Sequence, residues 1–450
     1  MTKKINKSII YKAVAIAVMI FLMLIPLMFV QNMIEDRDKY RQEAISKIIN
    51  SWGPNAAIAA PILNIPYLYE EQTLMNDGVV KSILKTGYAK YAPDNLNAEV
   101  KTTSQIRYIG IFKVPVFTAE VTIKGDFGDI TDMEPRSRLQ DAFVSFEINS
   151  LKGISVPNFI WNEEIKTFEP NKYGNTLKYQ NIDDYSYYGN YYRTVLSALS
   201  SKVELKDNNT FELKFTVKGS GNIGFYPIAK NNKISISSDW QNPNFSGAFL
   251  PETKEINENG FSAFWDINYL ASNVASRLDK VTNIYESIFT ASFIIPVDNY
   301  KNATRAVKYG ILFIVLTFVF CFAFEVANKK PIHPIQYLLV GFAMVIFYTL
   351  LVSISEFIDF SFAYLIAAAA TILLISVYTK IGIVKDISKK QIAVVVLSFT
   401  FLYGFLYILL QLQDMALLYG SIGLFAALAV IMYMTKNITW YEEIDTDKRF

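Results

Sequence analysis

Long apolar runs without charges stand at both ends of this chain, separated by a long polar interval. The first run, Ala13 to Val30, has 18 residues, and four lysines precede it, the last at Lys12. That length suits a helix crossing a hydrocarbon core of roughly 30 Å. No small residues of a cleavage site follow, because Gln31-Asn-Met33 comes directly after the run. The pattern predicts an uncleaved signal-anchor helix.

The apolar runs return after residue 308. They predict five further membrane helices: Tyr309 to Phe324, Ile335 to Ile354, Phe360 to Tyr378, Ile392 to Leu410 and Met415 to Met434. Small residues four apart in the third of these, Ala363, Ala367 and Thr371, favour close helix packing. Together with the first run, the prediction is six membrane helices.

The basic residues of the short connecting segments are distributed unequally. We number the six predicted helices spans 1 to 6 in chain order. Four Lys or Arg precede span 1, two lie between spans 2 and 3, four lie between spans 4 and 5, and three follow span 6. The loops Ser355–Asp359 and Gln411–Asp414 carry none. Basic segments stay in the cytoplasm. We therefore expect both termini inside: residues 1–30 as cytoplasmic N-terminus and first helix, 31–308 as a periplasmic domain, 309–434 as a five-helix bundle and 435–450 as a cytoplasmic tail.

Residues 31–308 are dominated by period-two alternation of apolar and polar positions. Phe117–Lys124, Ala142–Ile148, Phe211–Lys218 and Lys233–Ser237 show it most clearly. Half-buried strands separated by Asn, Asp, Gly and Pro indicate an all-β, all-antiparallel, sandwich-like domain of one or two subdomains. Residues 32–50 lack Gly and Pro and predict one helix that continues the first span outward. The fold class is therefore an α+β membrane protein.

Two aromatic segments of the external domain are candidates for ligand binding. Residues 181–193 contain five tyrosines among Asp and Asn, which could form a sugar- or peptide-binding platform, although a structural loop is the expected alternative. The segment 239–251 includes Trp240, Pro243, Phe245 and Gly247. It would form either a ligand rim or a packed corner, and we expect the corner.

Composition excludes several classes of function. The 450 residues are 52% hydrophobic and 19% charged, with net charge +2, so bulk electrostatics gives no reason to expect nucleic-acid binding. The single cysteine excludes an intramolecular disulfide. The single histidine, His333, lies in a predicted cytoplasmic loop, which excludes a Ser-His-Asp triad in the external domain. No hydrolase or phosphate-binding motif is present. We expect no enzyme, no cofactor and no metal, although paired carboxylates of a hydrolase would leave no sequence pattern.

Several segments in order resemble the CreD family of inner-membrane proteins. They are Ser51-Trp-Gly53, Pro61-Ile-Leu-Asn-Ile-Pro-Tyr67, Trp240-Gln-Asn-Pro-Asn-Phe-Ser-Gly247, Gly260-Phe-Ser-Ala-Phe-Trp265 and Pro331-Ile-His-Pro-Ile-Gln-Tyr337. The resemblance covers nearly the whole chain and is weakest around residues 170–205. It implies a role in cell-envelope integrity, colicin tolerance and the response to cell-wall stress, without an agreed molecular activity.

Three acidic residues border the predicted membrane helices. Glu356 and Asp359 stand at the outer end of span 3, and Glu325 stands at the inner end of span 2, where it could pair with Lys329 one turn away. At an interface such groups can reach water, which favours a structural role for all three. Glu356 is the best candidate for a functional role, because it lies among Ser353, Ser355 and Asp359 beside the strongest family block. His333 is a further candidate.

These observations favour a non-enzymatic inner-membrane protein that supports envelope integrity through a periplasmic binding or sensing domain. Its partners would be the lipid bilayer and an envelope protein, wall or lipid component. The alternative is a transporter or lipid-handling protein that uses the C-terminal helix bundle, and a periplasmic hydrolase is a third possibility.

Overall fold

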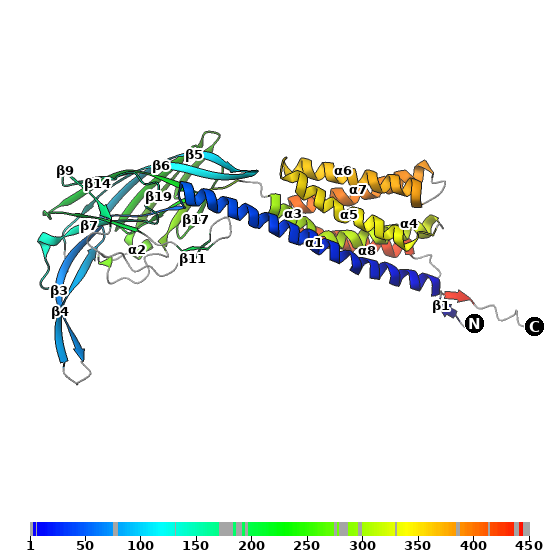
Figure 1. Cartoon of the computed structure of the whole chain (residues 1–450), viewed down its shortest axis with the longest axis horizontal. Coiled ribbons are helices and arrows are strands. Elements are labelled where there is room, and N and C mark those ends of the chain that lie inside the picture. Colours follow the sequence, from blue (N-terminus) through cyan, green and yellow to red (C-terminus); the bar gives the residue numbers. More distant parts are fainter. Residues whose placement is uncertain are drawn as a thin grey trace, which may run out of the picture. The chain divides into compact units, whose positions relative to one another are not determined.

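A computed structural model describes residues 3–5, 7–74, 80–130, 132–170, 183–185, 191–193, 197–273, 277–278, 287–295, 299–328, 331–383, 388–412, 415–435 and 441–443 (Figure 1). The chain divides into two compact units. One, here the helical unit, consists of Met1–Tyr40 and Val297–Phe450, and the other, here the β unit, consists of Arg41–Pro296. An N-terminal apolar helix, a large β-sheet domain and a C-terminal helix cluster confirm the α+β class.

Helix α1 runs without interruption over Lys7–Trp52. The sequence predicts this continuation, because the apolar run ends at Val30 and no Gly or Pro interrupts residues 32–50. Pro26 lies inside the helix without ending it, as membrane helices tolerate. Its buried apolar side chains recur at steps of three and four residues, at positions 16, 19, 23, 27, 30 and 34. This spacing places them on one face that packs against the other helices of the helical unit.

After the β unit, the described residues form six α-helices: α3 (Asn299–Lys308), α4 (Gly310–Asn328), α5 (Pro334–Ser355), α6 (Phe360–Tyr378), α7 (Lys389–Gln411) and α8 (Ala416–Thr435). A π-helical turn, Thr379–Ile383, extends α6. By length and composition, the described residues hold four helices able to cross a membrane, within α1, α5, α6 and α7; α3 and α4, bent by 46°, add a fifth if counted as one span. Four or five spans are thus found where six are predicted, and α8 is outside this count.

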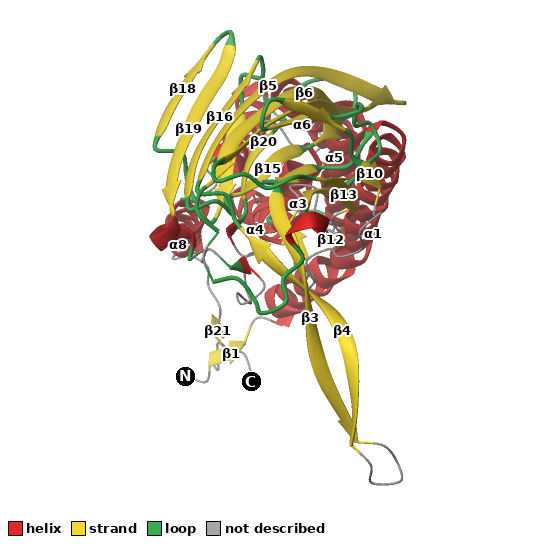
Figure 2. Cartoon of the chain, turned by 90° about the vertical axis from the view of Figure 1, so that its left-hand side faces the viewer, coloured by secondary structure: helices red, strands yellow, loops and turns green. Residues whose placement is uncertain are grey.

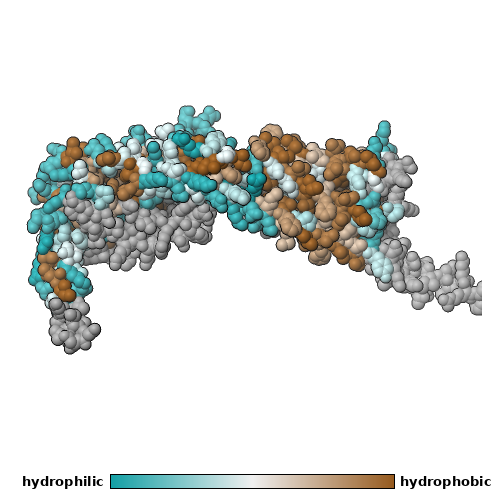
Figure 3. All heavy atoms as spheres, in the orientation of Figure 1, coloured by the Kyte–Doolittle hydropathy of each residue, from teal (hydrophilic) through white to brown (hydrophobic). Residues whose placement is uncertain are grey.

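The surface of the helical unit is apolar, and brown side chains cover most of the face in Figure 3. Phe362, Leu397 and Phe425 are 66%, 71% and 75% exposed. Such a surface is unfavourable in water and suits a hydrocarbon solvent. Inside the unit, Ala363, Ala367 and Thr371 are buried as their spacing predicts.

The β unit contains two large sheets. The first has the order β10-β13-β7-β2-β15-β20-β17, with β3 joined to β7 and β4 joined to β3. Its strands are β2 (Ala56–Ala59), β3 (Ile62–Leu74), β4 (Val80–Tyr91), β7 (Phe143–Ile148), β10 (Glu169–Pro170), β13 (Ser197–Lys202), β15 (Asn222–Tyr226), β17 (Pro243–Gly247) and β20 (Phe289–Phe293). The outer part of the β3–β4 hairpin extends beyond the sheet (Figure 2).

The second sheet has the order β18-β19-β16-β5-β6-β14-β8-β9. Its strands are β5 (Asn95–Ile109), β6 (Phe112–Phe127), β8 (Asn158–Trp161), β9 (Glu164–Lys166), β14 (Asn209–Ser220), β16 (Asn231–Ser238), β18 (Thr253–Asn257) and β19 (Gly260–Asn268). Short helices η1 (Leu139–Asp141) and α2 (Tyr269–Ser272) lie between strands. Two small pairs complete the list, β11 (Asp183–Tyr185) with β12 (Tyr191–Arg193), and β1 (Lys3–Ile5) with β21 (Tyr441–Glu443).

The four strongest alternating segments all lie in strands, namely β6, β7, β14 and β16, as predicted. The all-antiparallel prediction is wrong. Strand β15 pairs with β2 in parallel, and β16 pairs with β5 in parallel. Residues 223–226 join residues 56–59 in the first case, so the direction of pairing depends on the long-range path of the chain, which a period-two pattern does not record.

One apolar core joins the two sheets. Aromatic side chains make the contact between them: Trp265 of the second sheet stacks on Phe289 of the first at 4.6 Å between ring centroids, and Phe117 lies 4.9 Å from Phe293. Offset aromatic pairs add about 0.5–1.5 kcal/mol each beyond the burial of their area. Within the β unit the last turns of α1 pack on β6, where Ile45, Ile48 and Ile49 meet Val114 and Val116.

Candidate functional site

Glu356 joins three helices of the helical unit. It caps the C-terminus of α5, and its Oε1 atom accepts a hydrogen bond from the Tyr300 hydroxyl of α3 at 2.9 Å. The Nε atom of Arg37, on α1, lies 3.5 Å from the same oxygen. The Glu356 side chain is only 8% exposed. Beside it, Asn299 donates from its amide to the Ser355 carbonyl.

Glu325 makes an equivalent junction with other partners. Its Oε1 atom is ion-paired with Lys12 of α1, and its Oε2 atom accepts from the Tyr337 hydroxyl of α5 at 2.8 Å. The side chain of Glu325 is 10% exposed and that of Lys12 is 25% exposed. Lys329, the partner expected from sequence, lies outside the described residues. A buried carboxylate needs such partners, because an unpaired charge there is costly.

The two carboxylates therefore hold α1 at two levels. Lys12 and Arg37 are 25 residues apart, which is about 37 Å along a helix at 1.5 Å per residue. A bilayer is about 30 Å thick in its hydrocarbon core and about 40–45 Å with its headgroups. The distance between the two ion pairs along α1 falls between these two thicknesses.

Between the two ion pairs, glycines allow α1 to approach its neighbours. A Cβ atom at Gly341 of α5 would lie 2.7 Å from Met23 Sδ and 3.0 Å from the Phe318 ring. A Cβ atom at Gly310 of α4 would lie 3.0 Å from Leu27. Small residues at such positions are what close membrane-helix packing needs.

Asp359 and His333 have local structural contacts. Asp359 is the N-cap of α6, and its carboxylate accepts from Ser361 N at 2.8 Å. His333 is the exposed N-cap of α5 and forms a reciprocal capping box with Gln336. Each satisfies orphan N–H groups at a helix start. Neither residue joins the Glu356 or Glu325 junction.

The segment with Trp240, Pro243, Phe245 and Gly247 forms a packed corner of the β unit. Trp240 Nε1 donates to the carbonyls of Asn242 and Ile294 at 3.0 and 3.2 Å. Phe245 lies edge-on to Trp265 at 5.8 Å. Gly247 has φ +103°, and a Cβ atom there would stand 2.3 Å from the Ile288 carbonyl oxygen. Of the tyrosine-rich segment, only the β11–β12 pairing belongs to the described residues.

A polar groove of about 580 Å³ lies on the second sheet of the β unit. Asn95 donates from its amide to both carboxylate oxygens of Asp126, at 3.1 and 3.2 Å, and Asn231 donates to Asn95 Oδ1 at 3.1 Å. A hydrogen bond from Lys214 lowers the pKa of Glu212, a groove carboxyl. Further polar lining residues are Asn97, Lys124, Glu163, Thr210 and Lys233, and apolar side chains line it at Leu96, Ile160 and Phe211. The groove offers amides, carboxylates and ammonium groups to a polar ligand.

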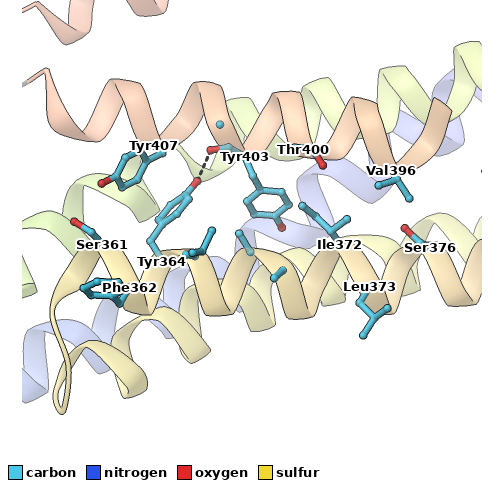
Figure 4. Close-up of a pocket in the computed structure, with 14 residues that line it drawn as sticks. Ser361, Phe362, Tyr364, Ile372, Leu373, Ser376, Val396, Thr400, Tyr403 and Tyr407 are labelled. Carbon is cyan, nitrogen blue, oxygen red and sulfur yellow. Dashed lines mark hydrogen bonds between the residues drawn. The ribbon is translucent and has the colours of Figure 1, made fainter. Parts of the chain in front are cut away.

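An apolar groove of about 730 Å³ separates α6 from α7 in the helical unit (Figure 4). Hydroxyl groups interrupt its apolar lining at Ser361, Tyr364, Ser376, Thr400, Tyr403 and Tyr407. Tyr364 donates to the Tyr403 carbonyl at 2.7 Å, which holds one end of the groove together.

Sequence reasoning missed Lys12, Arg37, Tyr300 and Tyr337 as partners of the carboxylates. A signal existed for Lys12, because it borders the first apolar run and stands on the same predicted side of the membrane as Glu325. No sequence pattern pointed to Tyr300 or Tyr337 as partners. Within the described ranges, no three His, Cys, Asp or Glu side chains gather into a group able to hold a metal.

Comparisons with known proteins agree with this architecture. A family model described as Inner membrane protein CreD matches residues 8–441. The Inner membrane protein CreD of Escherichia coli (strain K12) is 28% identical over 444 residues, which cover 97% of this chain and 95% of that protein. The chain belongs to the CreD family of inner membrane proteins.

Proposed function

We propose that this protein is a non-enzymatic inner-membrane protein that supports cell-envelope integrity and the envelope-stress response. Its β unit is the part that binds or senses an envelope component, and its helical unit is the anchor. The single observation that carries this proposal is the polar groove of about 580 Å³ on the β unit of a chain that also holds membrane-crossing helices. A large ligand surface fixed to a membrane anchor suits binding in the envelope better than free diffusion.

The proposed topology has six spans, both termini in the cytoplasm and residues 31–308 in the periplasm. The bent pair α3 and α4 counts as one crossing, and α8 is the sixth. Backbone pairing of β1 with β21 supports an even number of membrane spans, because it keeps both ends of the chain on the same side of the membrane. The orientation is supported by the distribution of basic residues: 13 Lys and Arg lie in the four segments predicted to be cytoplasmic, and the two short loops predicted to be periplasmic carry none.

The groove chemistry favours a polar envelope ligand such as a glycan or peptide portion of the wall or of an envelope protein. Its asparagine amides and Asp126 are linked to one another, which fixes their donors and acceptors in advance. Preorganised polar groups raise specificity because they lose little entropy on binding.

Site-specific photocrosslinking in living cells tests the proposal. A photoreactive residue at Lys233, which lines the groove, should capture an envelope component in the full-length chain. The matched control is Glu255, which is exposed on β18 and does not line the groove. Equal crosslinking at both positions, or none at Lys233 in stressed and unstressed cells, would count against the groove as the binding surface.

A second candidate function is transport or lipid handling by the helical unit. The apolar groove between α6 and α7 favours the lipid-handling form of this candidate. Reconstituted lipid movement that disappears in Glu356→Gln would favour it over the first proposal.

A further inference from the structure

The α6–α7 groove has a composition that suits one particular ligand class. Its walls are mainly Leu, Ile, Val, Ala and aromatic side chains, and it belongs to a unit whose outer surface is apolar. Its volume of about 730 Å³ falls in the usual range of ligand sites, roughly 300–1,000 Å³. Water is unfavourable in such a groove, whereas a hydrocarbon chain is not.

The groove also contains a buried hydroxyl that lacks a protein partner. Ser376 lines the groove and is only 9% exposed. Its hydroxyl oxygen has no hydrogen-bond partner among the described residues. A buried hydroxyl usually bonds to something, so the groove is suited to an apolar ligand that brings its own acceptors.

The rows of residues that line the groove continue to two lysines. On α6 the row runs through Ser361, Leu365, Ala368, Ile372 and Ser376, and Lys380 follows in the π-helical turn that extends this helix. On α7 the row of Val396, Thr400, Tyr403 and Tyr407, followed backward by seven residues, reaches Lys389. Both lysines are exposed. They mark the same end of the groove, because α6 ends where α7 begins.

The N-terminus of α7 adds to the positive potential at that end. The helix has 23 residues and begins at Lys389, with Ser388 as its N-cap. Unsatisfied N–H groups and the helix dipole favour an anion there. Two cations and a helix start therefore follow the Ser376 and Val396 end of the groove, as the phosphate and the acyl chain of one phospholipid would require.

We propose that the α6–α7 groove binds one anionic phospholipid, with an acyl chain between the helices, ester oxygens near Ser376 and the phosphate between Lys380 and Lys389. The groove spans Ser361 to Ser376 on α6, about 22 Å at 1.5 Å per residue. One leaflet of a roughly 30 Å hydrocarbon core is about 15 Å thick, so the groove accommodates a full acyl chain. This inference concerns binding alone, and it holds whether or not the protein moves lipids.

Native mass spectrometry of the full-length chain tests the site. The delipidated protein in detergent is titrated with phosphatidylglycerol and, separately, with phosphatidylcholine. The wild type should retain one phosphatidylglycerol and prefer it over phosphatidylcholine by about threefold, the size expected of partly screened lysine–phosphate pairs. Lys380→Gln with Lys389→Gln should abolish that preference, whereas Lys390→Gln, one residue off the row, should keep it.

Glycine substitutions test the groove itself. Gly404 lines the groove, and a Cβ atom there meets nothing within 4 Å, so Gly404→Phe should fill the space without a clash and weaken retention about tenfold. Gly420 on α8 is equally open but lies outside the groove, so Gly420→Phe is the matched control and should bind normally. Gly404→Ala should also bind normally.

Ser376→Ala separates a ligand role from a structural one. It should weaken retention several-fold, as the loss of one hydrogen bond predicts, and leave the thermal stability of the delipidated chain unchanged. Wild-type retention in Gly404→Phe, equal losses in Gly404→Phe and Gly420→Phe, or no preference for phosphatidylglycerol would each overturn the proposal. Because binding is measured directly, these results are independent of the test of the β unit.

Discussion

Arg37 and Glu356, 319 residues apart in the sequence, meet with 3.5 Å between Nε and Oε1. With the Lys12–Glu325 pair, this contact fastens the N-terminal helix to the C-terminal helices at two levels. An anchor that merely tethered the chain would need neither pair. We infer that α1 is a structural part of the helical unit.

Reversing the charges of the Arg37–Glu356 pair tests this role. Arg37→Glu should destabilise the helical unit, and Arg37→Glu with Glu356→Arg should recover part of the loss. The coupling energy from a double-mutant cycle should be about 0.5–1 kcal/mol, because Arg37 is 51% exposed and its charge is partly screened. Thermal unfolding in detergent measures it. The Asp36–Lys39 pair of the same helix, 66% and 74% exposed, is the control and should couple by close to zero.

The Lys12–Glu325 pair should be stronger. Lys12→Ala leaves Glu325 with Tyr337 as its remaining partner, and we expect a loss of about 1–3 kcal/mol in the free energy of unfolding. Tyr337→Phe should lose a similar amount, since it removes a hydrogen bond to a charged acceptor. Lys47→Ala, at an exposed position of α1, should change stability by less than about 0.5 kcal/mol. Equal effects of Lys12→Ala and Lys47→Ala would contradict the assignment.

Packing between the two pairs can be tested at Gly341. Gly341→Leu should cost about 1–3 kcal/mol, because its side chain would enter the space of Met23 and Phe318. Adding Met23→Ala should restore part of this loss by making room. Gly420→Leu, placed in open space on α8, should be nearly neutral. No rescue by Met23→Ala would argue that α1 does not pack at Gly341.

The packed corner of the β unit makes a separate prediction. Gly247→Ala should destabilise the β unit by more than about 2 kcal/mol, since it combines a left-handed backbone with a clash against Ile288 O. Gly110→Ala, with φ +58° and nothing within 4 Å, should cost only about 1–2 kcal/mol. Denaturant unfolding followed by tryptophan fluorescence compares the two. Equal losses would show that the corner is loosely packed.

Local features of this fold are predictable from sequence because local physics sets them. Charge-free runs of 16 to 20 residues predict the helices, and alternation predicts strands such as β6 and β14. The parallel pairing of β5 with β16 was not predictable, because residues 95–102 and 231–238 meet only through the path of the whole chain.

The candidate site was also predictable only in part. Glu325 and Glu356 stand out in sequence as acids beside apolar runs, yet their partners come from helices far away along the chain. Trp240 and Phe245 also stand out as aromatic residues, but their rings pack against Phe293 and Trp265. The α6–α7 groove could not be predicted from sequence, because Ser376, Tyr403 and Gly404 follow ordinary helical spacing and only helix packing brings them together.

The central claim is that the β unit works in the envelope through its polar groove. Its most direct test is complementation of a deletion strain, scored as survival under cell-wall stress. Asn97→Trp should fill the groove and fail to restore tolerance, whereas Lys101→Trp, four residues along the same face of β5, should restore it at equal protein level. Full complementation by Asn97→Trp would contradict the account.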